Sequence, residues 1–351
     1  MKVLGIMSGT SLDGLDLALV DFNERDPARF AFLATATYPY EAEWEERLRR
    51  AYEATARQLA RLDADFGLYI GRSVNRFLEE TGAPRPDLIA SHGQTIFHEP
   101  DRHYTCQIGS GPHIAAATGL PVIYDFRRQD VALGGQGAPL VPIGDKMLFS
   151  QYDYCLNIGG FANISFDDDQ GLRRAFDTGP ANIVLNYLAR RLGKPYDEGG
   201  RIARRGQLIP ALLEQLDDLP YYREAKPKSL GWEFVESSIL PLLDRAEAPV
   251  EDLLHTFVHH IARQIARFVK PGSTVLVTGG GAYNDFLIHT IERYSRARIV
   301  VPEARLIDFK EALVFALLGY LRARNRINIL ASVTGACCDH SAGLRAEAPP
   351  L

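Results

Sequence analysis

The chain has 351 residues, of which 46% are hydrophobic and 24% charged, and its formal net charge is −5. This is the composition of a globular protein, and the length favours two domains over one. The mild acidity gives no reason to expect nucleic acid or a membrane as partner, and the apolar runs are too short to cross a bilayer. No signal sequence precedes the first predicted strand, so we expect a cytoplasmic protein.

The first predicted element is a β-hairpin around a glycine-rich turn. Residues 3–7 are an apolar run, and residues 15–22 alternate apolar and polar side chains, as a half-buried strand does. The turn, residues 8–14, offers hydroxyls, backbone N–H groups and carboxylates, which a phosphate chain and its metal ion require. It is not a Walker loop, because no Gly-Lys-Ser/Thr follows. An ordinary hairpin turn is the alternative, and this segment alone leaves both open.

Strands alternating with helices follow, and this order predicts an α/β fold. The expected elements are a strand at 30–38, one or two helices within 41–80, strands at 87–91, 106–109 and 121–126, and a helix at 112–118. Residues 127–142 are rich in Gly and Pro and are the expected crossing between two domains, 1–140 and 141–351. The last helix is the one element that we allow to pack back on the first domain.

The second half opens in the same style as the first. The order strand, glycine turn, strand, strand occurs in residues 3–38 and again in 154–177. The expected elements of this half are strands at 154–158, 162–166, 172–176 and 274–278, and helices beginning near 181 and spanning 250–269 and 306–322. Two related halves would place their glycine turns across a central cleft, where ligands commonly bind.

Three glycine turns each follow a predicted strand, at residues 8–14, 159–160 and 279–281. Such turns let backbone N–H groups approach phosphates or a nucleoside closely, although glycines also simply close tight turns. No Gly-x-Gly-x-x-Gly motif opens a first βαβ unit, which argues against a Rossmann dehydrogenase.

Several acidic side chains are candidates for chemistry. Asp177 follows a predicted strand and precedes a helix, where it can accept a proton from water or a hydroxyl; a helix N-cap is the alternative role. Asp13, Asp16 and Glu311 are candidates for holding a divalent ion beside phosphates, or are solvated carboxylates.

Polar residues at the ends of two other strands suit recognition of a small molecule that bears hydroxyl, amide or carboxylate groups. Residues 91–95 contribute His92, Gln94 and Thr95, and the next segment contributes Arg127 and Asp130. The Arg127 guanidinium can bind a carboxylate through two hydrogen bonds. His92 is alternatively a structural histidine of the turn.

The chain resembles the anhydro-N-acetylmuramic acid kinase family along nearly its whole length. The matching motifs are at residues 7–14, 91–98, 125–127, 134–140, 156–163, 176–180, 195–197, 227–229, 278–281, 311–312 and 332–335. The resemblance implies an actin-like, duplicated RNase-H-like fold that closes around ATP. It also implies that water attacks the anomeric carbon of a 1,6-anhydro sugar while O6 takes the γ-phosphoryl group, a reaction of cell-wall recycling.

By the same resemblance, Asp177 is the expected general base, and Asp13 and Glu311 the expected Mg²⁺ ligands. The expected ATP site comprises Gly9, Thr10, Ser11, Leu12, Asp13, Gly14, Leu15, Asp16, Asn157, Gly159, Gly160, Gly279, Gly280, Gly281 and Asn284. The expected substrate site comprises His92, Gln94, Thr95, Gln107, Arg127 and Asp130. Two departures from relatives stand out: Met7 occupies a position where the superfamily usually has an aspartate, and Ser110 one where relatives often have an acid or amide.

These observations predict an ATP- and Mg²⁺-dependent kinase that converts 1,6-anhydro-N-acetylmuramic acid to N-acetylmuramic acid 6-phosphate. A kinase of another anhydro sugar, such as levoglucosan, is the alternative enzyme, and an actin-like ATPase module without a sugar substrate is the alternative class. We expect no nucleic-acid or membrane partner, and the long helix predicted at 250–269 is compatible with a homodimer.

Overall fold

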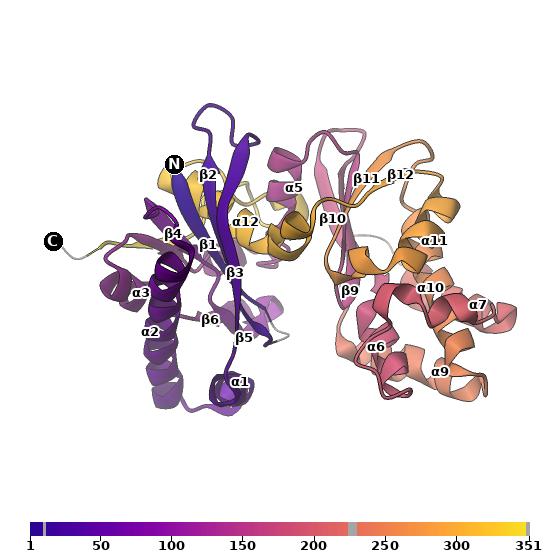
Figure 1. Ribbon diagram of the computed structural model, residues 1–351. Coiled ribbons are helices and arrows are strands. Elements are labelled where there is room, and N and C mark those ends of the chain that lie inside the picture. Colours follow the sequence, from indigo (N-terminus) through magenta and orange to yellow (C-terminus); the bar gives the residue numbers. More distant parts are fainter. Residues whose placement is uncertain (10–11, 224–229, 349–351) are drawn as a thin grey trace. The chain divides into compact units, whose positions relative to one another are not determined.

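The computed structural model describes residues 1–9, 12–223 and 230–348, and it divides into two compact units (Figure 1). Unit 1 comprises Met1–Phe149 and Phe309–Leu351, and unit 2 comprises Ser150–Asp308. The boundary expected between residues 140 and 141 therefore falls inside unit 1. Thr10 and Ser11, two of the expected ATP-site residues, lie outside the described residues.

Unit 1 is built on a six-stranded sheet with the order β13-β7-β4-β1-β2-β3. Its strands are β1 (Lys2–Ser8), β2 (Gly14–Phe22), β3 (Phe30–Pro39), β4 (Leu88–Ser91), β7 (Val122–Tyr124) and β13 (Leu344–Ala346). β1, β2 and β3 are antiparallel neighbours, whereas β1, β4 and β7 run parallel. A separate hairpin consists of β5 (Gln94–Glu99) and β6 (Tyr104–Ile108).

Helices cover both faces of this sheet. They are α1 (Ala42–Arg49), α2 (Ala56–Thr81), α3 (Gly111–Thr118), α4 (Arg128–Ala132), α5 (Pro142–Leu148), α12 (Ala304–Ala323) and α13 (Ala331–Thr334), with short 3₁₀ turns η1 (Arg50–Glu53) and η2 (Pro100–Arg102). α2 begins at a capping box between Thr55 and Gln58 and presents Phe66, Ile70 and Phe77 to the core. α12 lies so close to β1 that a Cβ on Gly5 would come within 1.9 Å of the Ala312 carbonyl oxygen.

Unit 2 repeats the central strand order of unit 1. Its sheet has the order β10-β9-β8-β11-β12, formed by β8 (Tyr154–Ile158), β9 (Phe161–Asp167), β10 (Arg173–Pro180), β11 (Thr274–Thr278) and β12 (Arg298–Val300). β8, β9 and β10 are antiparallel neighbours, whereas β8, β11 and β12 run parallel, as β1, β4 and β7 do in unit 1. The predicted duplicated α/β fold is therefore confirmed by the topology of both sheets.

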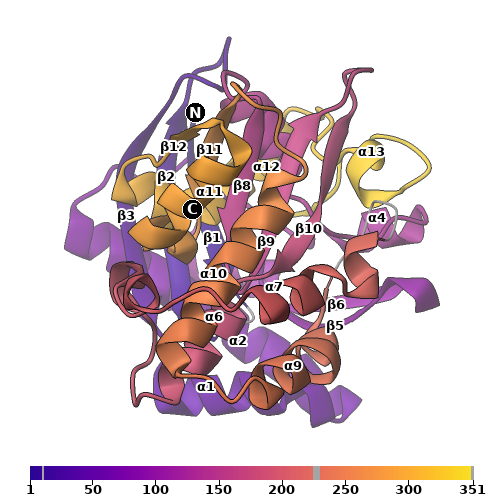
Figure 2. The same cartoon turned by 90° about the vertical axis from the view of Figure 1, so that its right-hand side faces the viewer.

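The remaining elements of unit 2 pack around this sheet, with α10 and α6 joining the same hydrophobic core (Figure 2). They are α6 (Asn182–Arg190), α7 (Pro210–Asp217), α8 (Trp232–Phe234), α9 (Leu240–Arg245), α10 (Val250–Ala266) and α11 (Asp285–Ser295), with the turns η3 (Glu198–Gly200), η4 (Ala203–Arg205), η5 (Pro220–Arg223), the π-helical η6 (Val235–Ile239) and η7 (Gly280–Tyr283). Among the described residues, no helix combines the length and the apolar character that a membrane span needs.

The glycine-rich segment at 127–142, predicted to be the crossing between two domains, is not that crossing. It lies inside unit 1, and the units join at residues 149–150 and 308–309 instead. The physical reason is Asp130, which is 0% exposed and binds both the Gly137 N–H (2.7 Å) and the Thr334 hydroxyl (2.7 Å). A Cβ on Gly135 would come within 2.3 Å of the Asp130 carboxylate, so glycine is needed for this loop to fold over it.

Candidate active site

Asp177 lies within β10, at a β-bulge. It pairs with Asn163 of β9, and Gly179 pairs with Ala162, so that Thr178 is the extra residue. The strand predicted to end at residue 176 therefore continues to Pro180, because pairing resumes after the bulge. The cap of α6 is Ala181 and makes no side-chain hydrogen bond, so the alternative role of Asp177 as the N-cap is excluded.

The carboxylate of Asp177 is partly buried and lightly bonded. Its Oδ2 accepts a hydrogen bond from the Leu230 N–H at 3.0 Å, and the described part of the chain gives the Asp177 carboxylate no other hydrogen bond or ion pair. Burial raises the pKa of Asp177 to about 6, with the Leu230 bond opposing this shift. A carboxylate with a pKa near working pH is well suited to accept a proton.

A network of buried polar side chains supports the backbone at the Asp177 bulge. The Tyr221 hydroxyl donates to the Asp177 carbonyl oxygen at 2.8 Å. The neighbouring Tyr222 ring packs on Gly179, and its hydroxyl lies 2.9 Å from His260 Nε2, whose Nδ1 lies 2.7 Å from Asp217. This network holds the backbone that carries the Asp177 carboxylate.

The strand register places Asp177 in one row with candidate nucleotide residues. Asp177 pairs with Asn163, Asn163 with Asn157, and Asn157 with Thr278, across four adjacent strands. Residues directly opposite each other project from the same face of a sheet. The exposed Asn163 was not among the predicted site residues, although its motif was recognised, and it lies between the candidate base and Asn157.

The glycines of unit 2 divide into open and packed positions. A Cβ on Gly159, Gly160 or Gly280 would meet no atom closer than 3.6 Å, so their backbones have room for a ligand. Gly279 and Gly281 instead pack against Ile158, where a Cβ would come within 2.8 and 2.2 Å of its atoms. Both glycine turns nevertheless lie together, because they follow the paired ends of β8 and β11.

Asn284, another predicted nucleotide residue, has a structural partner. Its side chain caps α11 by accepting a hydrogen bond from the Leu287 N–H at 3.0 Å. Its exposed surface is small, since the side chain is buried. The geometry therefore gives it the role of a helix cap that orders the end of the Gly279–Gly281 turn.

Leu12 and Gly14, which precede and begin β2, have close backbone surroundings. Leu12 has a left-handed backbone (φ 56°) and donates to the Gly9 carbonyl at 3.2 Å. Gly14 approaches β3 so closely that a Cβ would lie 2.4 Å from the Tyr38 carbonyl oxygen. Leu15 is buried in the core, so only its backbone is available to a ligand.

Acidic side chains gather near the start of β2. Asp16 pairs directly with Met7 across β1 and β2, so the two side chains project from the same face of the sheet. Asp13 is exposed, and both carboxylates lie within electrostatic range of the exposed Glu311 on α12. The Thr37 hydroxyl donates to Asp16 at 2.6 Å.

These acids alone do not enclose a metal ion. The described part of the chain contains no group of three or more His, Cys, Asp or Glu side chains arranged to hold one. Mg²⁺ is commonly bound by one or two carboxylates, with phosphates and water completing its octahedron. These oxygen donors therefore fit Mg²⁺ that arrives with a nucleotide.

His92 and Arg127, both predicted to contact the substrate, form a rigid pair. Arg127 Nε donates to His92 Nε2 at 3.1 Å, and its Nη1 donates to the Gly137 carbonyl at 2.6 Å. Burial, with Arg127 nearby, lowers the pKa of His92 to about 3, so the imidazole is neutral and accepts this bond. Burial lowers the pKa of Arg127 to about 10, which leaves it charged at neutral pH.

Two other predicted substrate residues are held by the protein. Gln94 is buried and bonds to the Ser8 hydroxyl, which also lies 2.6 Å from the Tyr40 hydroxyl. Asp130 is the buried carboxylate of the 127–142 loop described above. Both side chains are buried and bonded within the protein, so the structure gives them the role of loop supports. Thr95 is half-buried and pairs with Gln107 across β5 and β6.

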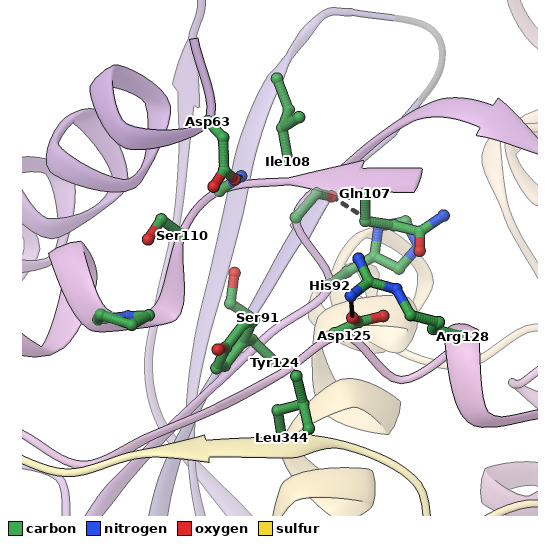
Figure 3. Close-up of a pocket in the computed structure, with 13 residues that line it drawn as sticks. Asp63, Ser91, His92, Gln107, Ile108, Ser110, Tyr124, Asp125, Arg128 and Leu344 are labelled. Atoms are coloured by element: carbon green, nitrogen blue, oxygen red, sulfur yellow. Dashed lines mark hydrogen bonds and ion pairs between the residues drawn. The ribbon is translucent and has the colours of Figure 1, made fainter. Parts of the chain in front are cut away.

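A cavity of about 240 Å³ brings His92 and Gln107 together with residues that were not among the predicted site residues (Figure 3). It lies beside the carboxyl ends of the parallel strands β4 and β7, which is where open α/β sheets bind ligands. The additional polar residues lining it are Asp63, Ser91, Ser110, Tyr124, Asp125 and Arg128. Ser91 and Asp125 lie in recognised motifs and Ser110 at a noted departure from relatives, whereas Asp63 comes from a distant segment that no local motif links to the others.

Comparison with known proteins places the chain in a family. The model of the family described as anhydro-N-acetylmuramic acid kinase matches residues 1–346. Relatives named anhydro-N-acetylmuramic acid kinase include those of Mannheimia succiniciproducens (35% identical, covering 97% of each chain), Shewanella denitrificans (36%, 95% of each) and Gloeobacter violaceus (37%, 95% of each). The chain belongs to the anhydro-N-acetylmuramic acid kinase family.

Proposed function

We propose that the protein is an ATP-dependent kinase of 1,6-anhydro-N-acetylmuramic acid that acts in the cytoplasm. Water adds to the anomeric carbon, the bond from that carbon to O6 breaks, and O6 takes the γ-phosphoryl group of ATP. The products are N-acetylmuramic acid 6-phosphate and ADP. The observation that carries the proposal is the partly buried Asp177 carboxylate, in a chain that belongs to this family.

Asp177 is the proposed general base in this reaction. Its Oδ2 is held by the Leu230 N–H and its backbone by Tyr221, so that the carboxylate is fixed before the substrate arrives. Above pH 6 it is ionised and accepts the proton that the water loses as it adds to the anomeric carbon. Fixing a base in advance lowers the entropic cost of bringing the reacting groups together.

ATP is proposed to bind at the glycine turns of unit 2. The open backbones at Gly159, Gly160 and Gly280 support this assignment, because phosphates and nucleosides require close backbone approach. In unit 1, Asp13, Asp16 and Glu311 are the carboxylates proposed to hold Mg²⁺, which when bound would neutralise negative charge on phosphates.

Arg127 is proposed to bind the carboxylate of the sugar's lactyl group. It keeps its charge at neutral pH, and the neutral His92 and the Gly137 carbonyl fix the plane of its guanidinium. A preoriented guanidinium binds a carboxylate with little further loss of side-chain freedom. The runner-up substrate, levoglucosan, has no such carboxylate and would leave Arg127 without a partner.

The direct test is turnover by the purified protein. We expect 1,6-anhydro-N-acetylmuramic acid, ATP and Mg²⁺ together to yield a 6-phosphorylated sugar and ADP, detected by mass spectrometry and coupled ADP assay. Omitting Mg²⁺ or the sugar should suppress product. If folded protein gave no phosphorylated sugar with the sugar, ATP and Mg²⁺ all present, the proposal would be refuted.

Substitution of Tyr221 by Phe tests the support of the base. The change removes the hydrogen bond to the Asp177 carbonyl, so we expect kcat to fall about 2–10-fold, the effect of one neutral hydrogen bond. Tyr187→Phe is the matched control, because among the described residues the Tyr187 hydroxyl accepts a hydrogen bond from Arg191 alone, the residue that follows α6. Equal effects of both changes on kcat would show that Tyr221 does not position the base.

A further inference from the structure

The cavity in unit 1 contains buried polar atoms that lack a hydrogen-bond partner. Among the described residues, the Ser91 hydroxyl, Gln107 Oε1 and Asp125 Oδ1 all have none, and all three residues line this one cavity (Figure 3). Ser91 is 0% exposed. Buried polar groups in folded proteins almost always have partners, and those that lack one need an explanation. A ligand that supplies the partners is such an explanation.

The charges around the cavity select the type of ligand. Two carboxylates line it, and burial raises the pKa of both Asp63 and Asp125, with Arg128 opposing the shift. The guanidinium of Arg128 is already paired with Asp125 at 3.2 Å. An anionic group would meet these carboxylates without an unpaired cation to compensate it, so a neutral group with a hydrogen-bond donor is favoured.

The unpartnered atoms and the apolar lining match an acetamido group. Gln107 Oε1 and Asp125 Oδ1 are acceptors, one of which can take the single acetamido N–H, while the Ser91 hydroxyl can donate to the acetamido carbonyl oxygen. Ile108, Pro112 and Leu344 add apolar surface to the same cavity, against which the acetamido methyl group can pack. A hydroxyl group could also bond to two of the polar atoms, but it would leave the apolar surface unused.

The backbone around the cavity is held in uncommon conformations. Asp125 has a left-handed backbone (φ 57°), which costs free energy for a residue other than glycine. Gly93 (φ 72°) lies where a Cβ would come within 2.4 Å of the Ile108 carbonyl oxygen. Such conformations persist where the surrounding structure requires them, and they concentrate at ligand sites.

We infer that this cavity binds the acetamido group at C2 of the anhydro amino sugar. The inference rests on the proposed function and extends it, because it assigns the discrimination between 2-acetamido and 2-hydroxy sugars to Ser91, Gln107 and Asp125. Ser91 and Asp125 are then specificity-determining residues, and Arg127 is left to bind the lactyl carboxylate.

Two sugars that differ only at C2 test the inference. Binding of 1,6-anhydro-N-acetylglucosamine and of 1,6-anhydroglucose to the full-length protein is measured by titration calorimetry without ATP. We expect the wild type to bind the acetamido sugar at least about tenfold more tightly, and Ser91→Ala to reduce this ratio by about tenfold. The second variant, Gln107→Leu, replaces the amide by an apolar side chain of similar size, and it should also lower the ratio of the two affinities.

Ser341→Ala is the matched control, because the Ser341 hydroxyl is likewise buried without a partner but does not line the cavity. Its ratio should equal that of the wild type. No preference in the wild type, an unchanged ratio in both cavity variants, or an equal loss of affinity for both sugars would overturn the inference. The expected change in binding without phosphorylation of any anhydro sugar would instead refute the proposed function and leave the inference standing.

Discussion

Substitution of Asp177 by Asn is expected to abolish turnover while leaving ATP affinity within a few-fold of the wild type. The amide keeps the shape and can still accept the hydrogen bond from the Leu230 N–H, but it cannot take a proton from water. General-base catalysis contributes about 10²–10⁴-fold, so kcat should fall by at least two orders of magnitude. Steady-state kinetics and nucleotide titration measure the two quantities. A parallel loss of ATP affinity would show that Asp177 has a structural role instead.

The wild-type pH profile gives the same assignment independently. Because Asp177 must be ionised to act as a base and burial raises its pKa to about 6, kcat/KM should be flat above this pH. Below it, the rate should fall about tenfold per pH unit, since the ionised fraction does so. The residual activity of Asp177→Asn should lack this acidic limb. A wild-type limb near pH 4, the ordinary range of an exposed carboxyl, would contradict the assignment.

The same substitution is expected to stabilise the fold at neutral pH. The pKa of Asp177 is raised from 3.8 to about 6 in the folded state, so folding is favoured by protonation. Protonation of Asp177 contributes fully to the free energy of unfolding below about pH 4, and this contribution is lost as the pH rises through 6. It amounts to at most about 3 kcal/mol, since each pKa unit corresponds to about 1.4 kcal/mol. Asp177→Asn carries no charge and should unfold at a higher temperature than the wild type at pH 8, with a much smaller difference at pH 4.

The regular elements of the fold could be predicted from residue patterns. The strand at 274–278 and the helices at 112–118 and 306–322 were located to within one or two residues, because their apolar periodicity is unambiguous. The hairpin strand at Gln94–Glu99 was missed, since its short polar sequence has no strand-like alternation. The extension of β10 past Asp177 was also missed, because a bulge depends on the partner strand and not on local sequence.

Individual glycine turns could be predicted from the sequence, but their tertiary neighbours could not. The turns at 159–160 and 279–281 follow the paired ends of β8 and β11, and this neighbourhood depends on strand pairing that the turns themselves do not encode. Asp63 on α2 and Asp125 after β7 line the same cavity. Because several helices and strands separate them in the sequence, no motif links them. Gln94 and Asp130 have polar side chains that equally suit ligands and buried supports, and only burial separates these roles.

Breaking the ion pair between Lys310 and Asp145 is expected to have the largest effect on stability. Lys310 Nζ lies 2.7 Å from Asp145 Oδ1, and the two side chains are 4% and 6% exposed. Lys310→Met removes the cation that lies 2.7 Å from the buried Asp145 carboxylate, and loss of one partner costs about 3–5 kcal/mol in comparable buried pairs. Asp145→Leu removes the other member of the same pair and should cost a similar amount. Urea unfolding followed by tryptophan fluorescence and circular dichroism measures both.

The double variant, Asp145→Leu with Lys310→Met, separates stability from function. Replacing both charges by apolar side chains removes the two members of the pair together, so most of the lost stability should return. Lys310 is also the residue before Glu311, one of the expected Mg²⁺ ligands, and it is among the charges that act on that carboxylate. If the pair serves only the packing of α5 against α12, the double variant should regain both stability and turnover. If it also sets the position and charge environment of Glu311, the double variant should be stable yet require more Mg²⁺ for half-maximal turnover. A double variant as unstable as either single one would show that the two charges do not act as a pair.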